Sequence, residues 1–271
     1  MKELATQEFK NLQVEILMIV DQFCREKGIQ YTVDGGTCIG AVRHKGYIPW
    51  DDDIDIAMTR PNYERFIHSF NGYHNHLEVF APELNWNYYA PYANVCDNRT
   101  FLDEGKNGHN GMEIGVKIDV FPIDGVANDI KRYHKDKKRL ALLWNILYIK
   151  RVSTNRSYHQ TIGNYLLFLV KRALLAPFSY SSIQKVIKRL ASKYPFEKAT
   201  YVEDRIYPQK HDIRCSRKAF EEYDEFPFEN IKVSILKGYD EYLTKIYGDY
   251  LTLPPADKRT AHHGFKSYWK Y

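Results

Sequence analysis

The chain has 271 residues, of which 44% are hydrophobic and 27% are charged, and its formal net charge is +5. A chain of this size can bury a substantial core, in one domain or in two smaller ones. The cysteines are scattered without paired spacing, which argues against a zinc site or a disulfide framework and is typical of a reducing cytoplasm. They are Cys24, Cys38, Cys96 and Cys215.

The sequence pattern also argues against export and membrane insertion. Glu8, Lys10 and Glu15 interrupt the first apolar positions, so the start of the chain does not resemble a signal peptide. The nearest candidate for a membrane span, residues 165–178, is short and contains Lys171 and Arg172. The sequence therefore predicts a cytoplasmic protein without a transmembrane helix.

The N-terminal segment is predicted to form an amphipathic helix. Its apolar residues recur every three or four positions, which is the spacing of one helical face, at Phe9, Leu12, Ile16, Ile19 and Phe23. Gly28 is well placed to end this helix, and a short strand is expected to begin at Tyr31.

That strand leads into a double glycine, Gly35 and Gly36, followed by a predicted helix over residues 37–44. Glycine lets the backbone approach a ligand closely, and the free N–H groups of a helix N-terminus attract anions. Gly35, Gly36 and Thr37 are therefore candidates for binding a phosphate group. Arg43, on the same helix, is placed to neutralise a phosphate, with a salt bridge along the helix face as the alternative.

An acidic run follows, with apolar residues at alternate positions beyond it, and this alternation predicts a strand. The acids are Asp51, Asp52, Asp53 and Asp55. On this pattern Asp51, Asp53 and Asp55 share one face, while Asp52 points to the other face with Ile54. Carboxylates gathered on one face repel each other unless they bind a cation, and Mg²⁺ or Mn²⁺ prefers such oxygen ligands. We therefore predict a metal site here, with a solvated acidic turn as the alternative.

Residues 59–102 are predicted to form a helix and then several short strands. Thr59 is a possible helix cap and Pro61 lies in the first turn. An apolar helical face follows at Tyr63, Phe66, Ile67 and Phe70. Residues 77–102 are rich in Tyr, Val and Phe, as strands are.

A second alternating run covers residues 114–124. Its buried face is predicted at Ile114, Val116, Ile118 and Val120. Lys117 and Asp119 lie on the opposite face, where Asp119 is a candidate functional carboxylate and an ordinary surface position is the alternative. Asp124 is a reserve candidate, since Pro122 suggests that the strand has already ended before it.

Residues 131–200 differ from the rest in composition. They contain 16 Lys or Arg and two acids, a local charge of +14, whereas the remainder of the chain carries −9. Apolar residues recur at helical spacing, and Pro177 and Pro195 are expected to bound the helices. The basic surface is either simply solvated or binds an anionic partner, such as a lipid-linked acceptor, an anionic membrane or a charged glycan. Nucleic acid is an unlikely partner, because no base-reading motif accompanies the charge.

The C-terminal part is predicted to contain a helix over residues 235–247, closed by Gly248. A basic stretch follows, in which arginine can bind phosphate oxygens in a bidentate fork and histidine can add a hydrogen bond or a proton. Its candidate substrate-binding residues are Lys258, Arg259, His262 and His263. Adjacent histidines also occur simply as surface or cap residues, which is the alternative here.

Three stretches together resemble the LicD/fukutin family of phosphotransferases, within the DNA polymerase β-like nucleotidyltransferase superfamily. They are GGTCIGAVRHKGYIPWDDDIDIAM at residues 35–58, KIDVFPID at 117–124 and YGDYLTLPPADKRTAHH at 247–263. The resemblance implies an α+β fold, with a polymerase β-like core of a small mixed sheet and flanking helices in residues 1–130. We expect a basic helical subdomain at 131–200 and a C-terminal segment, 201–271, that returns to the active site.

The resemblance also implies an activity. Members of this family are similar to enzymes that transfer phosphocholine from CDP-choline to a sugar of teichoic acid, capsule or lipopolysaccharide and release CMP. Asp53, Asp55 and Asp119 would then be catalytic, and these three with Asp51 would bind Mg²⁺ or Mn²⁺. Asp119 would accept the proton of the attacking hydroxyl group.

Several alternatives remain open at this point. The donor is either CDP-choline or another CDP-alcohol, carrying ribitol or glycerol phosphate. Ordinary nucleotidyl transfer from an NTP is a second possibility, and a non-catalytic protein that binds an anionic glycan through its basic segment is a third. If choline is the cargo, its quaternary ammonium group would need an aromatic cage, to which the aromatic cluster at residues 86–92 is a possible contributor.

Overall fold

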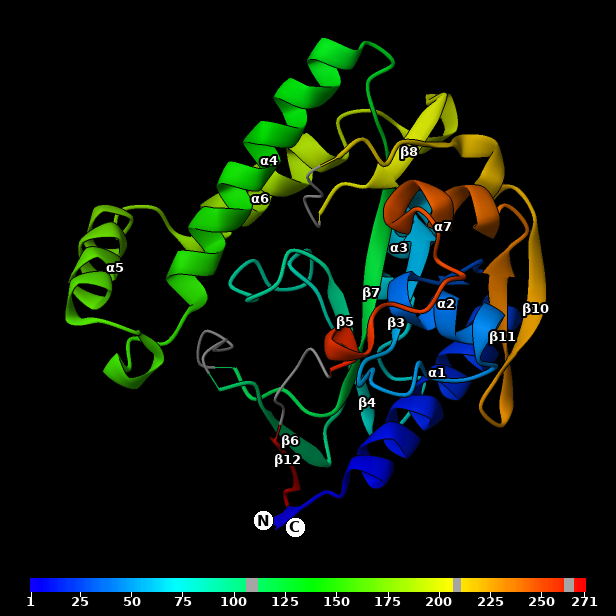
Figure 1. The fold of residues 1–271 in the computed structure, drawn as a ribbon, viewed down its shortest axis with the longest axis horizontal. Helices are drawn as coiled ribbons and strands as arrows, with labels where there is room; N and C mark the ends of the chain where they lie inside the picture. The colour runs from blue at the N-terminus through cyan, green and yellow to red at the C-terminus, as the bar shows by residue number, and fades with distance from the viewer. Residues whose placement is uncertain (106–111, 207–210, 261–265) are drawn as a thin grey trace.

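The computed structural model describes residues 1–105, 112–206, 211–260 and 266–271 (Figure 1). Helices and strands are mixed along the chain, so the predicted α+β class is confirmed. The central sheet has the strand order β2-β3-β7-β5-β4, and β8 pairs with both β7 and β9. Only β3 and β7 run parallel among these pairs of described strands. The strands are Thr32–Val33 (β2), Asp55–Thr59 (β3), Leu77–Phe80 (β4), Ala93–Asp97 (β5), Lys117–Gly125 (β7), Tyr201–Asp204 (β8) and Cys215–Ser216 (β9).

The strand β7 is the centre of this sheet, and the predicted buried face is confirmed at Ile114, Val116, Ile118 and Val120. The prediction that Pro122 ends the strand is wrong, because β7 continues past it to Gly125. The N–H of Asp119 points toward β3 and donates to the carbonyl of Ile54 at 2.9 Å. Because N–H groups alternate in direction along a strand, the position of Pro122 faces the opposite edge of β7, away from β3. On that edge β5 pairs only as far as Val120 and β8 begins at Ile123. Pro122 therefore lies in a gap where no ladder hydrogen bond is lost.

The predicted helices near the sheet are present as α1 (Thr6–Lys27), α2 (Gly35–Arg43) and α3 (Arg60–Ser69). As expected, α1 ends at Gly28, whose backbone is left-handed with φ of 59°. Thr59 stands at the N-cap of α3 without a side-chain cap hydrogen bond, and Pro61 lies in the first turn. The predicted apolar faces are buried, with Phe9, Leu12, Ile16 and Phe23 in α1 and Tyr63, Phe66, Ile67 and Phe70 in and after α3.

The acidic run departs from the prediction in one respect. Asp51, Asp52 and Asp53 precede the strand, which begins only at Asp55. The neighbouring strand β2 supplies two paired residues and then stops, because the carboxylate of Asp34 accepts a hydrogen bond from the Gly35 N–H and caps α2. Among the described strands none pairs with residues 51–53, so the alternating pattern does not become a strand there. The same cap starts α2 two residues earlier than predicted.

The remaining strands form two smaller sheets. Strands β1 (Lys2–Glu3) and β6 (Thr100–Asp103) flank β12 (Lys266–Trp269), which brings the two chain ends together (Figure 1). Strands β10 (Tyr223–Phe228) and β11 (Ile231–Leu236) form an antiparallel hairpin. The helix predicted over residues 235–247 is shorter, because Ile235 and Leu236 belong to β11 and are buried there; α7 covers Tyr239–Tyr247.

The basic segment is helical, as predicted, and consists of α4 (Ile130–Arg151), α5 (Ile162–Leu174) and α6 (Tyr180–Ala191). Figure 1 shows α4 as a long helix beside the central sheet, with α5 at the outer edge of the molecule. Short 3-10 turns occur at Arg156–Tyr158, Phe196–Lys198, Arg217–Phe220 and Ala256–Lys258. Within the described part of the chain, no helix has both the length and the apolar content that a bilayer span requires.

Candidate active site

The predicted aspartates Asp55 and Asp119 lie side by side on the two parallel strands. They are register partners in the β3–β7 ladder, and the hydrogen bond from the Asp119 N–H to the Ile54 carbonyl fixes that register. Alternation then points the two side chains to the same face of the sheet, opposite to Ile118 and Val120. The sheet therefore brings together two carboxylates that are 64 residues apart in the chain.

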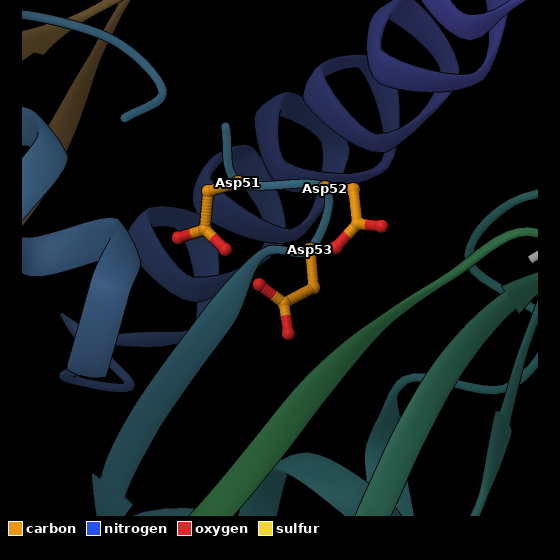
Figure 2. Close-up of side chains that lie close together, drawn as sticks. All are labelled: Asp51, Asp52 and Asp53. Carbon is orange, nitrogen blue, oxygen red and sulfur yellow. The ribbon is translucent and has the colours of Figure 1, made fainter. Parts of the chain in front are cut away.

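The three aspartates before β3 form a compact cluster (Figure 2). Each of Asp51, Asp52 and Asp53 offers a carboxylate oxygen, and these oxygens lie within 4.8 Å of one another. The prediction that Asp52 points away from Asp51 and Asp53 is wrong, because these residues lie before the strand and their side chains do not alternate. One loop thus presents three carboxylates next to the paired ones of β3 and β7.

The predicted phosphate-binding turn borders the same acids. Gly35 has a left-handed backbone, with φ of 51°, and a side chain there would contact Oδ2 of Asp55 at 3.4 Å. A Cβ atom at Gly36 would collide with Oδ2 of Asp51. Both glycines therefore leave the space in which the start of α2 faces the carboxylates. The hydroxyl of Thr37 instead accepts a hydrogen bond from the Asp55 N–H at 2.9 Å, which fixes the start of β3.

A cavity of about 610 Å³ joins these elements, a volume typical of small-molecule sites. Gly35, Gly36 and the predicted aspartates Asp51, Asp53, Asp55 and Asp119 all line it. Two further acids and five aromatic residues lie in its wall: Asp34, Asp204, Trp50, Tyr92, Phe121, Tyr242 and Tyr247. Of these, only Tyr92 belongs to a segment that the sequence singled out, the aromatic cluster at residues 86–92. The cavity is thus acidic at the sheet edge and aromatic around it.

The crowding of acids affects their protonation. Burial, and then the nearby carboxylates of Asp53 and Asp119, raise the pKa of Asp55 well above its ordinary value. Burial also raises the pKa of Asp34, although hydrogen bonds from the Tyr242 hydroxyl and the Gly35 N–H partly oppose this effect. Negative charge at this edge is therefore unfavourable unless a cation shares it.

A network that the sequence did not reveal holds Asp119 in place. Lys117 donates from Nζ to Oδ1 of Asp119 at 2.6 Å, and the side-chain amide of Asn94 donates to the same oxygen. The amide oxygen of Asn94 accepts hydrogen bonds from the hydroxyls of Tyr88 and Tyr89, so the orientation of the amide is fixed. Among the described residues, the structure shows these donors on Oδ1 and none on Oδ2 of Asp119.

Lys117 was recognised only as a neighbour of Asp119 on one strand face. Burial by itself lowers the pKa of Lys117, but Asp119, Tyr89 and Glu104 together outweigh burial and hold the pKa well above its ordinary value. The ammonium group therefore stays charged beside Asp119. Asn94 is the cross-strand partner of Asp119 in the β5–β7 ladder, and only knowledge of that register would have identified it.

The C-terminal segment lies against one side of the site. Arg43 donates to the carbonyl of Tyr250 at 2.7 Å, so it contacts this segment and is not among the residues that line the cavity. Burial, and then the charge of Arg259, lower the pKa of Arg43. Arg259 donates to the carbonyl of Pro254 at 2.8 Å and its guanidinium lies 5.7 Å from the ring centre of Trp50, a cavity residue.

The other predicted residues of this segment are placed differently. Lys258 ends the 3-10 turn Ala256–Lys258 and is exposed. His262 and His263 lie outside the described residues. Phosphate binding by this basic stretch therefore stays a prediction.

Two reserve ideas are not supported by the geometry. Asp124 is almost fully buried and makes a bidentate ion pair with Arg60, with N–O distances of 2.8 and 2.5 Å, so it is a structural residue. Within the aromatic cluster of residues 86–92, Tyr88 and Tyr89 are buried in the core and bonded to Asn94, and only Tyr92 reaches the cavity wall. The aromatic wall comes mainly from other segments.

The donor set of this cavity suits a hard divalent cation. The clustered ligand atoms are carboxylate oxygens, which Mg²⁺ and Mn²⁺ prefer, and the start of α2 beside them suits an anion. A pocket that combines both features defines the class of site that binds a phosphorylated ligand together with its cation.

Comparisons with known proteins agree with this class. Residues 28–139 match the family model described as LicD/FKTN/FKRP, nucleotidyltransferase domain. The chain is 31% identical, over 99% of both proteins, to the lipopolysaccharide cholinephosphotransferase LicD of Haemophilus influenzae. An uncharacterised protein of Rickettsia prowazekii is 39% identical over 33% of this chain and 30% of its own length. The chain therefore belongs to the LicD family.

Proposed function

We propose that this protein transfers phosphocholine from CDP-choline to a hydroxyl group of a cell-surface glycan precursor, releasing CMP. The observation that carries this proposal is the full-length similarity to a lipopolysaccharide cholinephosphotransferase. The cavity supports it, because acids and aromatic side chains line a space of suitable size for a nucleotide. The acceptor would be a precursor of teichoic acid, capsule or lipopolysaccharide, and the reaction would take place in the cytoplasm.

The carboxylates of Asp51, Asp53, Asp55 and Asp119 would hold Mg²⁺ or Mn²⁺, within a core of the polymerase β-like type. When bound, the cation would neutralise the charge of the diphosphate and of the departing CMP. The glycine turn would bind donor phosphate oxygens through the backbone N–H groups at the start of α2. Positioning and electrostatics supply most of the catalysis in phosphoryl transfer, so few other groups are required.

The bond changes are simple. The acceptor oxygen forms a bond to the phosphorus of the choline phosphate, and the bond from that phosphorus to the CMP oxygen breaks. The proton of the acceptor hydroxyl passes to the carboxylate of Asp119, which Asn94 and Lys117 orient. The aromatic side chains Trp50, Tyr92 and Tyr247 are candidates to contact the quaternary ammonium group of choline.

Product analysis separates this reaction from its rivals. With labelled CDP-choline, Mg²⁺ and a glycan acceptor, we expect CMP and a labelled glycan in equal amounts. Release of pyrophosphate from CTP would instead indicate nucleotidyl transfer. Unchanged cellular function after Asp53→Asn would indicate a non-catalytic binding protein.

A thermal-shift series would identify the alcohol that the donor carries. CDP-choline, CDP-ribitol, CDP-glycerol and CTP are compared with Mg²⁺ present, because a ligand that binds only the native state raises the melting temperature. We expect the largest shift with CDP-choline. A larger shift with CDP-ribitol or CDP-glycerol would reassign the cargo and retain the reaction type.

A further inference from the structure

The helix α5 carries its apolar side chains on the outside. No residue of this helix is buried, and five of its large apolar residues are exposed: Ile162, Leu166, Leu167, Val170 and Leu174. Leu166 is 56% exposed, Val170 55% and Leu174 72%. Ile162, Leu166, Val170 and Leu174 follow one another at four-residue spacing, so they form one continuous stripe along the helix.

The inward side of α5 consists of the half-buried Tyr165, Phe168, Leu169 and Arg172, so the exposed stripe is a second apolar face that this packing does not cover. Arg172 points toward α4 and donates to the carbonyls of Ile149 and Val152 at 3.2 and 2.9 Å. Lys150, near the end of α4, donates in return to the carbonyl of Leu175 at 3.1 Å. Each cation thus binds carbonyl groups at the C-terminal end of the other helix. These hydrogen bonds hold α5 with its apolar stripe turned away from the rest of the protein.

The charge around the stripe is of one sign. Residues 137–196 contain twelve Lys or Arg and no Asp or Glu. Lys171 is exposed on α5 itself, next to the stripe, and Arg156 is exposed in the turn before it. A protein surface that carries the same positive charge would repel a second copy of this segment, whereas an anionic surface would attract it.

We propose that α5 is a docking helix that lies in the interfacial layer of an anionic lipid bilayer. The apolar stripe would enter the boundary between headgroups and acyl chains, and the surrounding cations would contact lipid phosphates. The shape agrees with this partner, since α5 is a convex element at the outer edge of the molecule (Figure 1). Contiguous exposed apolar patches of this kind mark interaction sites rather than ordinary surface. This inference does not depend on the proposed transfer reaction.

Flotation with lipid vesicles tests the proposal on the full chain. We expect the protein to float with phosphatidylcholine vesicles that contain phosphatidylglycerol, and to float much less with phosphatidylcholine alone or at high salt. The double variant Leu166→Gln, Val170→Gln should lower the partition coefficient by about tenfold or more, because two apolar side chains are lost from the stripe. Lys171→Gln should lower it about fivefold.

A matched control is available in Met18, which is 49% exposed on α1, away from the basic segment. Met18→Gln should leave vesicle binding unchanged. Melting temperatures of all variants should match the parent protein, since the replaced side chains are already exposed. Absence of vesicle binding, or equal binding by the double variant, would overturn the proposal. A dimer in solution that the double variant dissociates, without vesicle binding, would assign the stripe to a second copy of the chain and also overturn it.

Discussion

Strand β7 carries two aspartates with different roles, one near each end. Asp119 lies at one end, where it lines the cavity beside Asp55 and shares one oxygen between Lys117 and Asn94. Asp124 lies at the other end, where Arg60 binds both of its oxygens in the core. A carboxylate whose oxygens are all occupied by a buried partner contributes to folding, whereas one that faces a cavity among other acids can bind a ligand. The comparison shows that the partners of an aspartate determine its role.

The largest expected effect is the loss of transfer activity at the cavity end. Replacing Asp119 by Asn removes a carboxylate that accepts a proton, and such groups contribute about 10²–10⁴-fold to rate. We expect Asp119→Asn to lower kcat, per folded molecule, by about a thousandfold, together with a lower melting temperature, because the buried Lys117 loses its counter-charge. Steady-state kinetics with CDP-choline measure the first effect and thermal unfolding the second. A variant that keeps most of its activity would remove Asp119 from the reaction.

The next effect is a loss of stability at the other end of β7. Asp124→Asn leaves the guanidinium of Arg60 buried and without its full counter-charge, which typically costs about 3–5 kcal/mol. We expect denaturant unfolding to show a loss of this order, while kcat per folded molecule is retained. The double variant Arg60→Met, Asp124→Leu should recover part of the stability, because it removes both charges of this pair while Glu83 loses its ion pair with Arg60. Loss of activity in Asp124→Asn without loss of stability would contradict the assignment of the two ends.

A smaller effect is expected from the residue that orients Asp119. Asn94→Ala removes the amide that joins Asp119 to Tyr88 and Tyr89. We expect kcat to fall by about tenfold, roughly the contribution of one hydrogen bond to a charged group, while KM for CDP-choline changes little. A rise in KM with unchanged kcat would indicate that Asn94 contacts the donor instead of positioning Asp119.

The smallest expected effect is a gain in stability at the crowded acidic edge. Burial and neighbouring carboxylates raise the pKa of Asp55 in the folded chain, so its ionised form disfavours folding above the unfolded pKa of about 3.9. Without a divalent cation at neutral pH, Asp55→Asn should raise the melting temperature by about 2–4 °C. The difference should disappear as the pH falls below about 4, where the carboxyl group is protonated in the unfolded chain as well as in the folded one. A destabilised Asp55→Asn would show that the acids are already compensated by other groups.

Much of this site could be predicted from the sequence, because its main acids follow local patterns. The alternation around Ile54 and Val120 predicted where Asp55 and Asp119 would point, and the glycine pair indicated an open helix start. The sequence pattern does not predict that the strand begins at Asp55. That boundary depends on where the neighbouring strand β2 ends. The alternation of acidic and apolar residues before Asp55 does not indicate where β2 ends.

Other parts of the site depend on contacts between distant segments. Asn94 reaches Asp119 through the β5–β7 register, and Tyr242 and Tyr247 join the cavity wall from α7, more than 100 residues beyond β7. Pro122 predicted the end of the strand, but β7 continues past it, because Pro122 lies between the residues that pair with β5 and those that pair with β8. Long-range topology decided each of these cases, and a single sequence does not specify it locally.

The proposed activity requires a divalent cation that these aspartates and a diphosphate bind together, and metal binding tests this requirement most directly. Electron paramagnetic resonance measures free Mn²⁺ in the presence of the protein and CDP-choline. We predict that the parent protein depletes free Mn²⁺ in a saturable manner, and that Asp53→Asn and Asp55→Asn weaken this binding strongly while Asp124→Asn, studied below its melting temperature, does not. Equal Mn²⁺ binding by the parent protein and the two site variants would contradict the account.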